Sequence, residues 1–389
     1  MIRKIFILGW VLISISLFLY SFTQVDLSLT LSRMSIYQTT EKWFQYVGYF
    51  NRPFSTNLFI GIIILMFASY IFVLRNVLKK KLDMRTVWWG VILVTIILAF
   101  SYNAFSYDLF NYIFDAKILV HYHLNPYQHK ALDFLGDPML SFMHWTQRTY
   151  PYGPTWLIIT APLVFIGNNI FLVTFFLFKI LAAASFLGTT WFVKKIAEKT
   201  KIIKPEFAVA SFAFNPLVII ESLVSGHNDI VMMFFAIMAL FYFIENKYIV
   251  SILSFLMSIL LKFATGILLP VLLWFSWKGK KTEKSYEQFF LISSAAMIIP
   301  VIFATLRTNF QPWYLLDVLP IASLVFYKKY VALPVIIFSF ISLCQYIPFL
   351  FTGNWNPPIP TILVDMNWVA FILSCIAVVI VLLQKKKSF

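Results

Sequence analysis

Residues 101–154 read SYNAFSYDLFNYIFDAKILVHYHLNPYQHKALDFLGDPMLSFMHWTQRTYPYGP, and they form the longest non-hydrophobic interval after the first fifty residues. The interval holds four of the five histidines and four of the sixteen acidic residues of the chain. In a sequence with few polar groups, such a concentration predicts that the chemistry lies here. We therefore expect the apolar runs on either side to act as its scaffold.

The rest of the chain is strongly apolar. Of its 389 residues, 61% are hydrophobic and 12% are charged, whereas about 25% of the residues of a soluble domain are charged. Repeated apolar runs of roughly 15–24 residues predict an all-α, polytopic integral membrane protein. We place twelve transmembrane helices at 4–22, 57–74, 86–101, 170–193, 205–224, 230–244, 247–262, 264–277, 286–305, 313–327, 331–350 and 366–383.

The formal net charge of +15 reflects membrane topology. Basic residues gather in the links between alternate apolar runs, at 75–85, 194–204 and 278–284, as the positive-inside rule expects. This placement argues against nucleic acid as a partner. It predicts a multi-pass cell membrane protein with both termini cytoplasmic and with 23–56, 101–154 and 351–365 on the extracellular face.

Residues 155–166 are apolar but only twelve long, and a span there would invert the topology of everything downstream. Their length favours a re-entrant or interfacial helix. We find no soluble domain and no internal repeat. The prediction is one membrane-embedded domain over residues 1–389, with 101–154 as an outer loop within it.

Several kinds of chemistry have no support in the sequence. Cys344 and Cys375 both lie in apolar runs and build neither a disulfide framework nor a metal motif. The histidines match no zinc spacing, and the chain has no phosphate-binding loop for nucleotides. We therefore predict no cofactor, and a divalent cation, although possible, is unsupported.

The segment from Phe105 to Tyr122 has the spacing of an interfacial helix, with apolar residues on one face. Asp108, Asn111 and Asp115 fall near the opposite face. Asp108 and Asp115 lie about 10 Å apart along a helix, too far for the carboxylate pair of a retaining glycosidase. A single carboxylate that acts as a base on an acceptor hydroxyl is the simpler use. The alternative is that Asp108 only caps or solvates the helix end.

Three further groups could contribute to a site. The turn Gly226-His227-Asn228-Asp229 is costly in a membrane unless it lines water or a site, although a tight turn with Asp229 as helix N-cap explains it equally well. Basic residues at outer span ends could hold a phosphate or could extend to the lipid headgroups; these are Arg148, Lys262 and Arg307.

The third group is Trp313 and Tyr314, which follow Pro312 at a span end and suit either a membrane aromatic belt or a sugar-binding cleft. Lys179 lies in the middle of a predicted span, and we assign it no role.

The order of these motifs resembles a known family. Tyr107-Asp108, Asn125-Pro126-Tyr127, Tyr150–Pro154, Gly226–Asp229 and Pro312–Leu316 together resemble the GT-C glycosyltransferase superfamily. The similarity is to family 87 and to the polyprenol-phosphate-mannose-dependent mannosyltransferases. It implies a membrane enzyme of the cell envelope that transfers a hexose, mannose first, from a polyprenyl-phosphate donor on the outer face. The transfer inverts the anomeric centre, and the general base corresponds to Asp108.

The resemblance also implies partners: a lipid-linked sugar donor, a glycan, glycolipid or cell-wall acceptor, and membrane lipids. Loops 23–56 and 351–365 would recognise the acceptor, because the carboxy-terminal soluble domain of some relatives is not expected here. Residues 121–124 also replace the glycine-rich approach common in the family. We expect substrate contacts from Tyr107, Asn111, Asp115, Arg148, Tyr152, His227, Asn228, Asp229, Lys262, Arg307, Trp313 and Tyr314, with Lys262 and Arg307 as the preferred phosphate pair.

Two other classes of function remain. A transporter or flippase of lipid-linked sugars would have ionisable residues deep inside several spans and an inverted repeat, and the sequence shows only Lys179 in such a place. A structural subunit without chemistry would tolerate the loss of Asp108.

Overall fold

The computed structural model describes residues 1–278 and 281–387; residues 279–280, in the predicted basic link 278–284, and 388–389 lie outside them. Within the described residues the regular elements are helices, and the one β feature is an isolated bridge between Lys130 and Thr149. The predicted all-α class is confirmed. Six helical segments are long and apolar enough to cross a membrane: α1 (Ile2–Ser21) with η1 (Phe22–Gln24), α3 (Arg52–Leu78), α7 (Phe171–Thr200), α13 (Glu283–Ala296) with α14 (Ile298–Thr308), α16 (Lys329–Cys344) with α17 (Tyr346–Thr352), and α18 (Ile359–Lys387).

A seventh candidate span is broken. Helix α8 (Pro205–Ala213) meets the helical segment formed by α9 (Pro216–Ile219) and η5 (Ile220–Val224) at a bend of 60°. The break falls at Asn215, whose side chain accepts a hydrogen bond from the Leu217 amide at 3.0 Å. Pro216 lacks an N–H group and starts the new helix. The predicted span 205–224 is therefore two helical pieces that meet inside the protein.

The predicted count of twelve spans is not confirmed. Four other predicted spans are helical, but each has between 10 and 17 residues, and about 20 are needed to cross the hydrocarbon core. They are α4 (Met84–Ala99), α10 (Asp229–Ile244), α11 (Tyr248–Ile259) and η6 (Phe263–Ile267) with α12 (Leu268–Ser276).

The prediction of one helix over 313–327 is wrong. That stretch consists of three short turns: η7 (Pro312–Asp317), α15 (Leu319–Ala322) and η8 (Ser323–Val325). Pro320 falls inside the predicted helix, and proline both removes a helical hydrogen bond and collides with the preceding turn. An apolar run of this length therefore indicates burial here, not a spanning helix.

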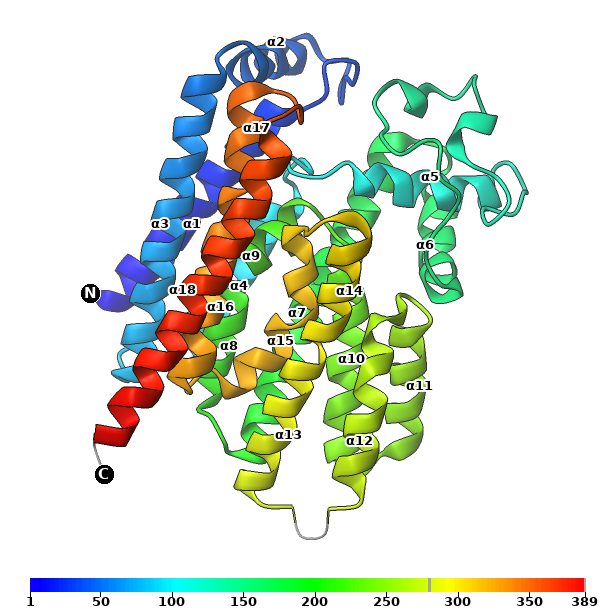
Figure 1. Cartoon of the computed structure of the whole chain (residues 1–389). Helices are drawn as coiled ribbons and strands as arrows, with labels where there is room; N and C mark the ends of the chain where they lie inside the picture. The colour runs from blue at the N-terminus through cyan, green and yellow to red at the C-terminus, as the bar shows by residue number, and fades with distance from the viewer. Residues whose placement is uncertain (279–280, 388–389) are drawn as a thin grey trace.

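The predicted outer loop contains helix α5 (Asp108–Val120), which lies across the ends of the long helices (Figure 1). The same loop also contains η3 (Ala131–Asp133) and η4 (Pro138–Ser141). The same end of the molecule carries α2 (Ser35–Gln45), which is followed by η2 (Tyr46–Phe50) in the predicted outer loop 23–56. Leu109, Phe110, Ile113 and Phe114 are all buried, because α5 packs against α6 (Pro154–Gly167) and α7. The predicted helix is present, and its apolar side faces the helix bundle.

The predicted re-entrant segment 155–166 is helix α6, whose first turn is tied to the chain between α11 and η6. The amides of Gly153 and Thr155 donate to the carbonyls of Leu261 and Leu260 at 3.0 and 3.1 Å. That α6 is re-entrant or interfacial, and does not cross the membrane, stays a prediction.

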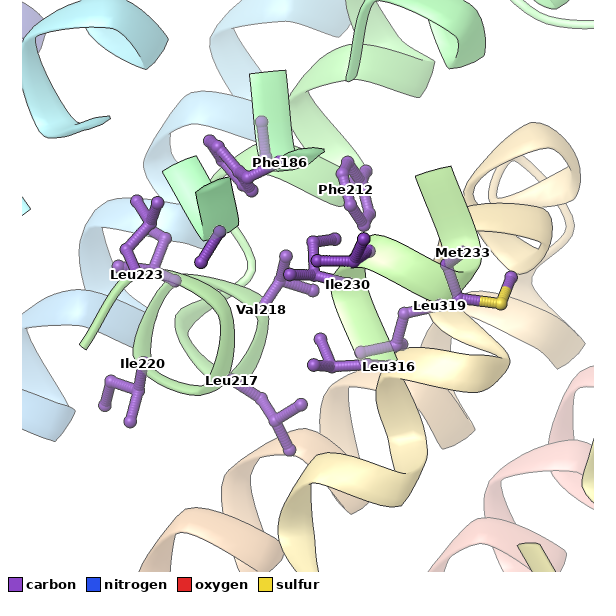
Figure 2. Close-up of a cluster of buried hydrophobic side chains, with 14 of the residues drawn as sticks. Phe186, Phe212, Leu217, Val218, Ile220, Leu223, Ile230, Met233, Leu316 and Leu319 are labelled. Atoms are coloured by element: carbon purple, nitrogen blue, oxygen red, sulfur yellow. The ribbon is translucent and has the colours of Figure 1, made fainter. Parts of the chain in front are cut away.

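The core beneath these outer elements holds the short helices together. Figure 2 shows side chains from α7, α8, the α9–η5 segment, α10 and the η7–α15 region converging on one apolar cluster. Lipid tails are as apolar as leucine, so close van der Waals packing must supply the association between helices. This packing fixes the non-helical turns next to it. The labelled members are Phe186, Phe212, Leu217, Val218, Ile220, Leu223, Ile230, Met233, Leu316 and Leu319.

Candidate active site

The candidate site starts at Asp108, the first residue of α5. The N-cap residue of α5 is Tyr107, whose side chain makes no cap hydrogen bond, and the amide of Asp108 donates to the hydroxyl of Ser106 at 3.1 Å. The Asp108 carboxylate faces His227, with Oδ2 3.6 Å from Nδ1. The Asp108 side chain is 21% exposed and that of His227 is fully buried. Asp108 is thus the accessible end of a buried pair.

His227 is held on three sides. Its Nε2 lies 3.4 Å from Oε2 of Glu221, and its ring stacks on Trp313 with centroids 4.1 Å apart. Glu221 in turn accepts a hydrogen bond of 2.8 Å from the hydroxyl of Tyr346 in α17. The four groups Asp108, His227, Glu221 and Tyr346, here called the acid–histidine chain, run from the partly exposed carboxylate into the buried interior.

The backbone places His227 by a sharp turn after η5. Gly226 has φ +71°, a left-handed conformation that glycine adopts without the usual Cβ penalty. The His227 amide donates to the Glu221 carbonyl at 3.1 Å. Helix α10 then begins at Asp229 with Asn228 as its N-cap, so the interpretation of Asp229 as the N-cap is wrong. Asp229 has a different partner.

That partner is Lys262, which forms an ion pair with Asp229 Oδ1. Burial alone would lower the pKa of Lys262, but Asp229 and Asp317 together raise it above its ordinary value. Burial, followed by the charge of Asp229, raises the pKa of Asp317 well above its usual range. The Lys262 ammonium also lies 5.6 Å from the ring centre of Tyr314. Lys262 is therefore already neutralised by a carboxylate.

The carboxylates of α5 are perturbed as well. Burial raises the pKa of Asp108, and Asp229 adds to this, whereas His227 and Lys262 lower it; the net pKa is above the ordinary value. Burial and the charge of Asp108 raise the pKa of Asp115 to about 8. Asn111 lies between them on the same helix, and its Oδ1 is buried without a hydrogen-bond partner among the described residues.

The other predicted residues lie at the edge of this arrangement. Arg148 is exposed, with its guanidinium 4.5 Å from the ring centre of Trp145, yet its charge helps to lower the pKa of Asp108. Arg307 is exposed in the last turn of α14, and the next residue, Thr308, shares a 2.8 Å hydrogen bond with the Tyr314 hydroxyl. Among the described residues neither arginine forms an ion pair.

The two remaining predicted tyrosines point to different neighbours. The Tyr107 hydroxyl donates to Asp26 at 3.3 Å, so Tyr107 joins the site to the loop 23–56. The Tyr152 ring contacts that of Tyr112 with centroids 5.5 Å apart, and the Tyr112 hydroxyl donates to Asn228 at 3.4 Å. Tyr152 therefore connects to the His227 turn through Tyr112.

Three residues of the arrangement were not predicted as site residues. Glu221 had a usable signal, since it lies within the predicted span 205–224, near its outer end, and an ionisable residue in a span is a functional hypothesis by default. Asp317 had the same kind of signal in the span predicted over 313–327. Tyr346 had none, because nineteen tyrosines in the chain offer no way to select one.

Two hollows lie elsewhere, beside the far half of α5. One of about 610 Å³ is lined by residues from His123 to Tyr127. Another of about 250 Å³ contains the ion pair of Lys117 and Asp137, at 2.5 Å. Neither is lined by Asp108 or His227. Among the described residues, no group of three or more His, Cys, Asp or Glu side chains could hold a metal ion.

Comparisons with known proteins agree with the predicted family. Two curated relatives, each named Alpha-(1->6)-mannopyranosyltransferase A, come from Mycobacterium tuberculosis and Corynebacterium glutamicum. Each is 26% identical to this chain, over 167 and 152 residues, or 42% and 39% of it. The matched stretches span only 32% and 31% of the relatives' own lengths. No solved structure matches the chain.

The family described as "Alpha-(1->6)-mannopyranosyltransferase, N-terminal domain" matches residues 7–278. That stretch includes α5, the His227 turn and Lys262, but it ends before Trp313 and Tyr346. It covers more than half of the chain, and it confirms the resemblance to GT-C mannosyltransferases. The chain belongs to the alpha-(1->6)-mannopyranosyltransferase family.

Proposed function

We propose that this protein transfers a hexose, mannose first, from a polyprenyl-phosphate donor to a glycan, glycolipid or cell-wall acceptor on the extracellular face. The observation that carries the proposal is the position of Asp108. It is a partly exposed carboxylate at the start of α5, backed by the buried His227 at 3.6 Å. Family membership and the names of the two curated relatives support mannose as the sugar.

In the proposed reaction Asp108 acts as the general base. Its carboxylate takes the proton from an acceptor hydroxyl while that oxygen forms a bond to the anomeric carbon. The bond from this carbon to the phosphate oxygen breaks on the opposite face, so the configuration inverts and the lipid phosphate leaves. A pKa raised above the ordinary value makes Asp108 a stronger base, which general base catalysis requires.

His227 would orient this base. Its Nδ1 faces Asp108, and Glu221 and Trp313 fix its ring. The separation of 3.6 Å is longer than a hydrogen bond, as is common in catalytic groups before the substrate is bound. We propose that the contact shortens when the acceptor binds, and that the imidazole then holds the carboxylate toward the acceptor hydroxyl.

The leaving phosphate needs cations. The contacts of the basic side chains favour a different pair from Lys262 and Arg307, the pair preferred from the sequence. Lys262 is paired with Asp229, whereas Arg148 and Arg307 form no ion pair among the described residues. Arginine can bind a phosphate through two parallel N–H donors. We therefore propose Arg148 and Arg307 as the phosphate contacts, with Lys262 holding the turn at Asp229.

The test is sugar transfer in membranes from radiolabelled polyprenyl-phosphate mannose. Wild type is compared with Asp108→Asn at matched expression, and Asp133→Asn is the control because Asp133 is an exposed carboxylate of the same loop. Loss of transfer in Asp108→Asn alone, with donor binding retained, supports the proposal. Equal transfer in all three would move the base to Asp115 or Asp229.

A transporter or flippase of lipid-linked sugars is the second candidate. The observation in its favour is that Lys179 and Glu221 are ionisable side chains buried in candidate spans. If wild type gives no transfer with several donors, movement of a fluorescent lipid-linked sugar across proteoliposomes tests this candidate directly.

A further inference from the structure

Lys179 is a buried cationic side chain to which the proposed reaction gives no role. It lies on α7, a candidate membrane-spanning helix, and is 1% exposed. An ionisable residue in such a place is costly unless its polar atoms have partners. The ammonium donates to the Ser101 hydroxyl at 3.1 Å, to the Val224 carbonyl at 2.7 Å and to the Leu223 carbonyl. Three acceptors match the three N–H donors of a lysine ammonium.

Two of the acceptors belong to the segment that carries His227. Leu223 and Val224 end η5, and the last carbonyls of a helix have no partner within it. The chain then turns through Gly226 to His227. Lys179 therefore fixes the backbone directly before the turn that positions the imidazole.

The third acceptor belongs to the segment that carries Asp108. Ser101 lies where the chain leaves α4 and begins the approach to α5. Its hydroxyl donates to the Leu98 carbonyl at 2.6 Å, which leaves its oxygen free to accept from Lys179. One side chain thus binds the segment that leads to Asp108 and the segment that carries His227.

The aliphatic part of the Lys179 side chain also packs against the turn at Gly226. A Cβ placed on Gly226 would be 3.9 Å from the Lys179 Cδ and 3.4 Å from a methyl group of Leu109, in α5. The turn is therefore packed between the lysine stem and the residue that follows Asp108. Other buried polar groups of α7, such as Thr189 and Thr190, donate only to carbonyls of their own helix.

We propose that Lys179 is a positioning residue that sets the separation of Asp108 and His227 by tying the ends of their two segments together. This inference rests on the proposed transfer reaction. A displacement of about 1 Å at a reacting group can lower a rate roughly 100-fold.

The experiment compares wild type with Lys179→Met, which keeps the length of the stem and removes the three donors. We expect kcat for transfer to fall about 10- to 100-fold, with the KM for the donor within roughly twofold, since the ammonium of Lys179 donates to Ser101, Leu223 and Val224 and is not proposed to hold the phosphate. The acid limb of the pH profile should also move, because His227 helps to set the pKa of Asp108. Lys179→Arg, which retains a charged donor, should keep more transfer than Lys179→Met.

Two further variants make the result specific. Thr189→Val, on the same helix, is the control and should leave kcat and the pH profile unchanged. Ser101→Ala removes one acceptor, and its effect combined with Lys179→Met should be less than additive, as expected for groups in one network. Unchanged kcat and pH profile in Lys179→Met would overturn the inference.

A readout that needs no activity separates this inference from the proposed function. Hydrogen exchange at the amides of residues 223–227, measured by mass spectrometry, should be faster in Lys179→Met and in Ser101→Ala than in Thr189→Val. If wild type transfers no sugar, the proposed function fails, and exchange still decides whether Lys179 holds this turn. If Lys179→Met does not fold, Ser101→Ala decides it, and exchange equal to that of wild type overturns the inference.

Discussion

Asp108 differs from Glu221 and Asp229, the carboxylates next to it in the His227 turn region, because solvent reaches it. Its side chain is 21% exposed, whereas the side chains of Glu221 and Asp229 are 0% and 1% exposed. A base must meet the hydroxyl that it deprotonates, so exposure together with the contact to His227 selects Asp108 within the group. The two buried carboxylates instead hold His227 and Lys262.

This arrangement has a pH signature. The active form of Asp108 is the deprotonated one, so kcat/KM should fall as the pH drops through its pKa. Because that pKa is raised, the midpoint should lie above the value of about 3.9 for an ordinary aspartate. His227 lowers the pKa of Asp108, so His227→Gln should move the midpoint further upward and reduce kcat by roughly 100-fold. A midpoint that stays the same in His227→Gln, measured from pH–rate profiles, would contradict the coupling of the two groups.

Asp115 should destabilise the fold at neutral pH. Its pKa of about 8 in the folded protein is above the unfolded value, so folding takes up a proton and stability falls as the pH rises from roughly 4 to 8. Asp115→Asn resembles the protonated acid and avoids this loss. We expect the variant to be more stable than wild type by about 2–4 kcal/mol at pH 7 and nearly equal to it at pH 4. Thermal unfolding in detergent at both pH values checks this, with Asp133→Asn as the exposed control.

The sequence predicted some of these residues and their contacts, but not others. Asp108 was predicted as the base by resemblance, which stays a prediction, and its helix was predicted by apolar periodicity. The partners of Asp108 could not be found in this way, because His227 and Glu221 are brought to α5 by the turn at Gly226 and by contacts between distant segments. Lys262 was predicted as a phosphate contact from its place at a span end, and only the folded arrangement places it against Asp229.

At the scale of elements, the broken helices decide the geometry of the site. Asn215-Pro216 bends one candidate span by 60°, and Pro320 divides the stretch predicted as a single helix over 313–327. Both breaks place irregular backbone inside an apolar bundle, where it is tolerated only if protein surrounds it. Hydropathy averaged over a window detects apolar content and misses such breaks, and this is why the bend at Asn215 and the short elements over 313–327 were not predicted.

The turn after η5 gives a test at this scale. Gly226→Ala should destabilise the protein by about 1–2 kcal/mol, because its φ of +71° is unfavourable for a residue with a Cβ atom. The nearest atom to that Cβ would be 3.4 Å away, an ordinary contact, so the penalty belongs to the backbone. Gly61→Ala, in helix α3 with nothing within 4 Å of its Cβ, is the matched control and should not destabilise. Equal thermal stability of the two variants would show that the turn is unstrained.

At the scale of the whole molecule, the predicted outer loops gather at one end. Helices α2 and α5 lie at this end, whereas α12 ends and α13 begins at the opposite end (Figure 1). The predicted topology puts these two ends on opposite sides of the membrane. This topology depends on α6, because a crossing there would move every later link to the other side of the membrane. The 14 residues of α6 are too few for an ordinary span, so we expect no crossing.

Cysteine labelling can decide this point. In a background without Cys344 and Cys375, we expect a membrane-impermeant thiol reagent to label Ser35→Cys and Thr149→Cys on intact cells. Thr282→Cys, also at an exposed position, should react only after the membrane is permeabilised. If Thr282→Cys reacts on intact cells together with Ser35→Cys, α6 crosses the membrane. The partly exposed Asp108 is in the same loop as Thr149, so labelling at Thr149 also tests whether the proposed base faces the extracellular side, where a lipid-linked donor would have to present its sugar.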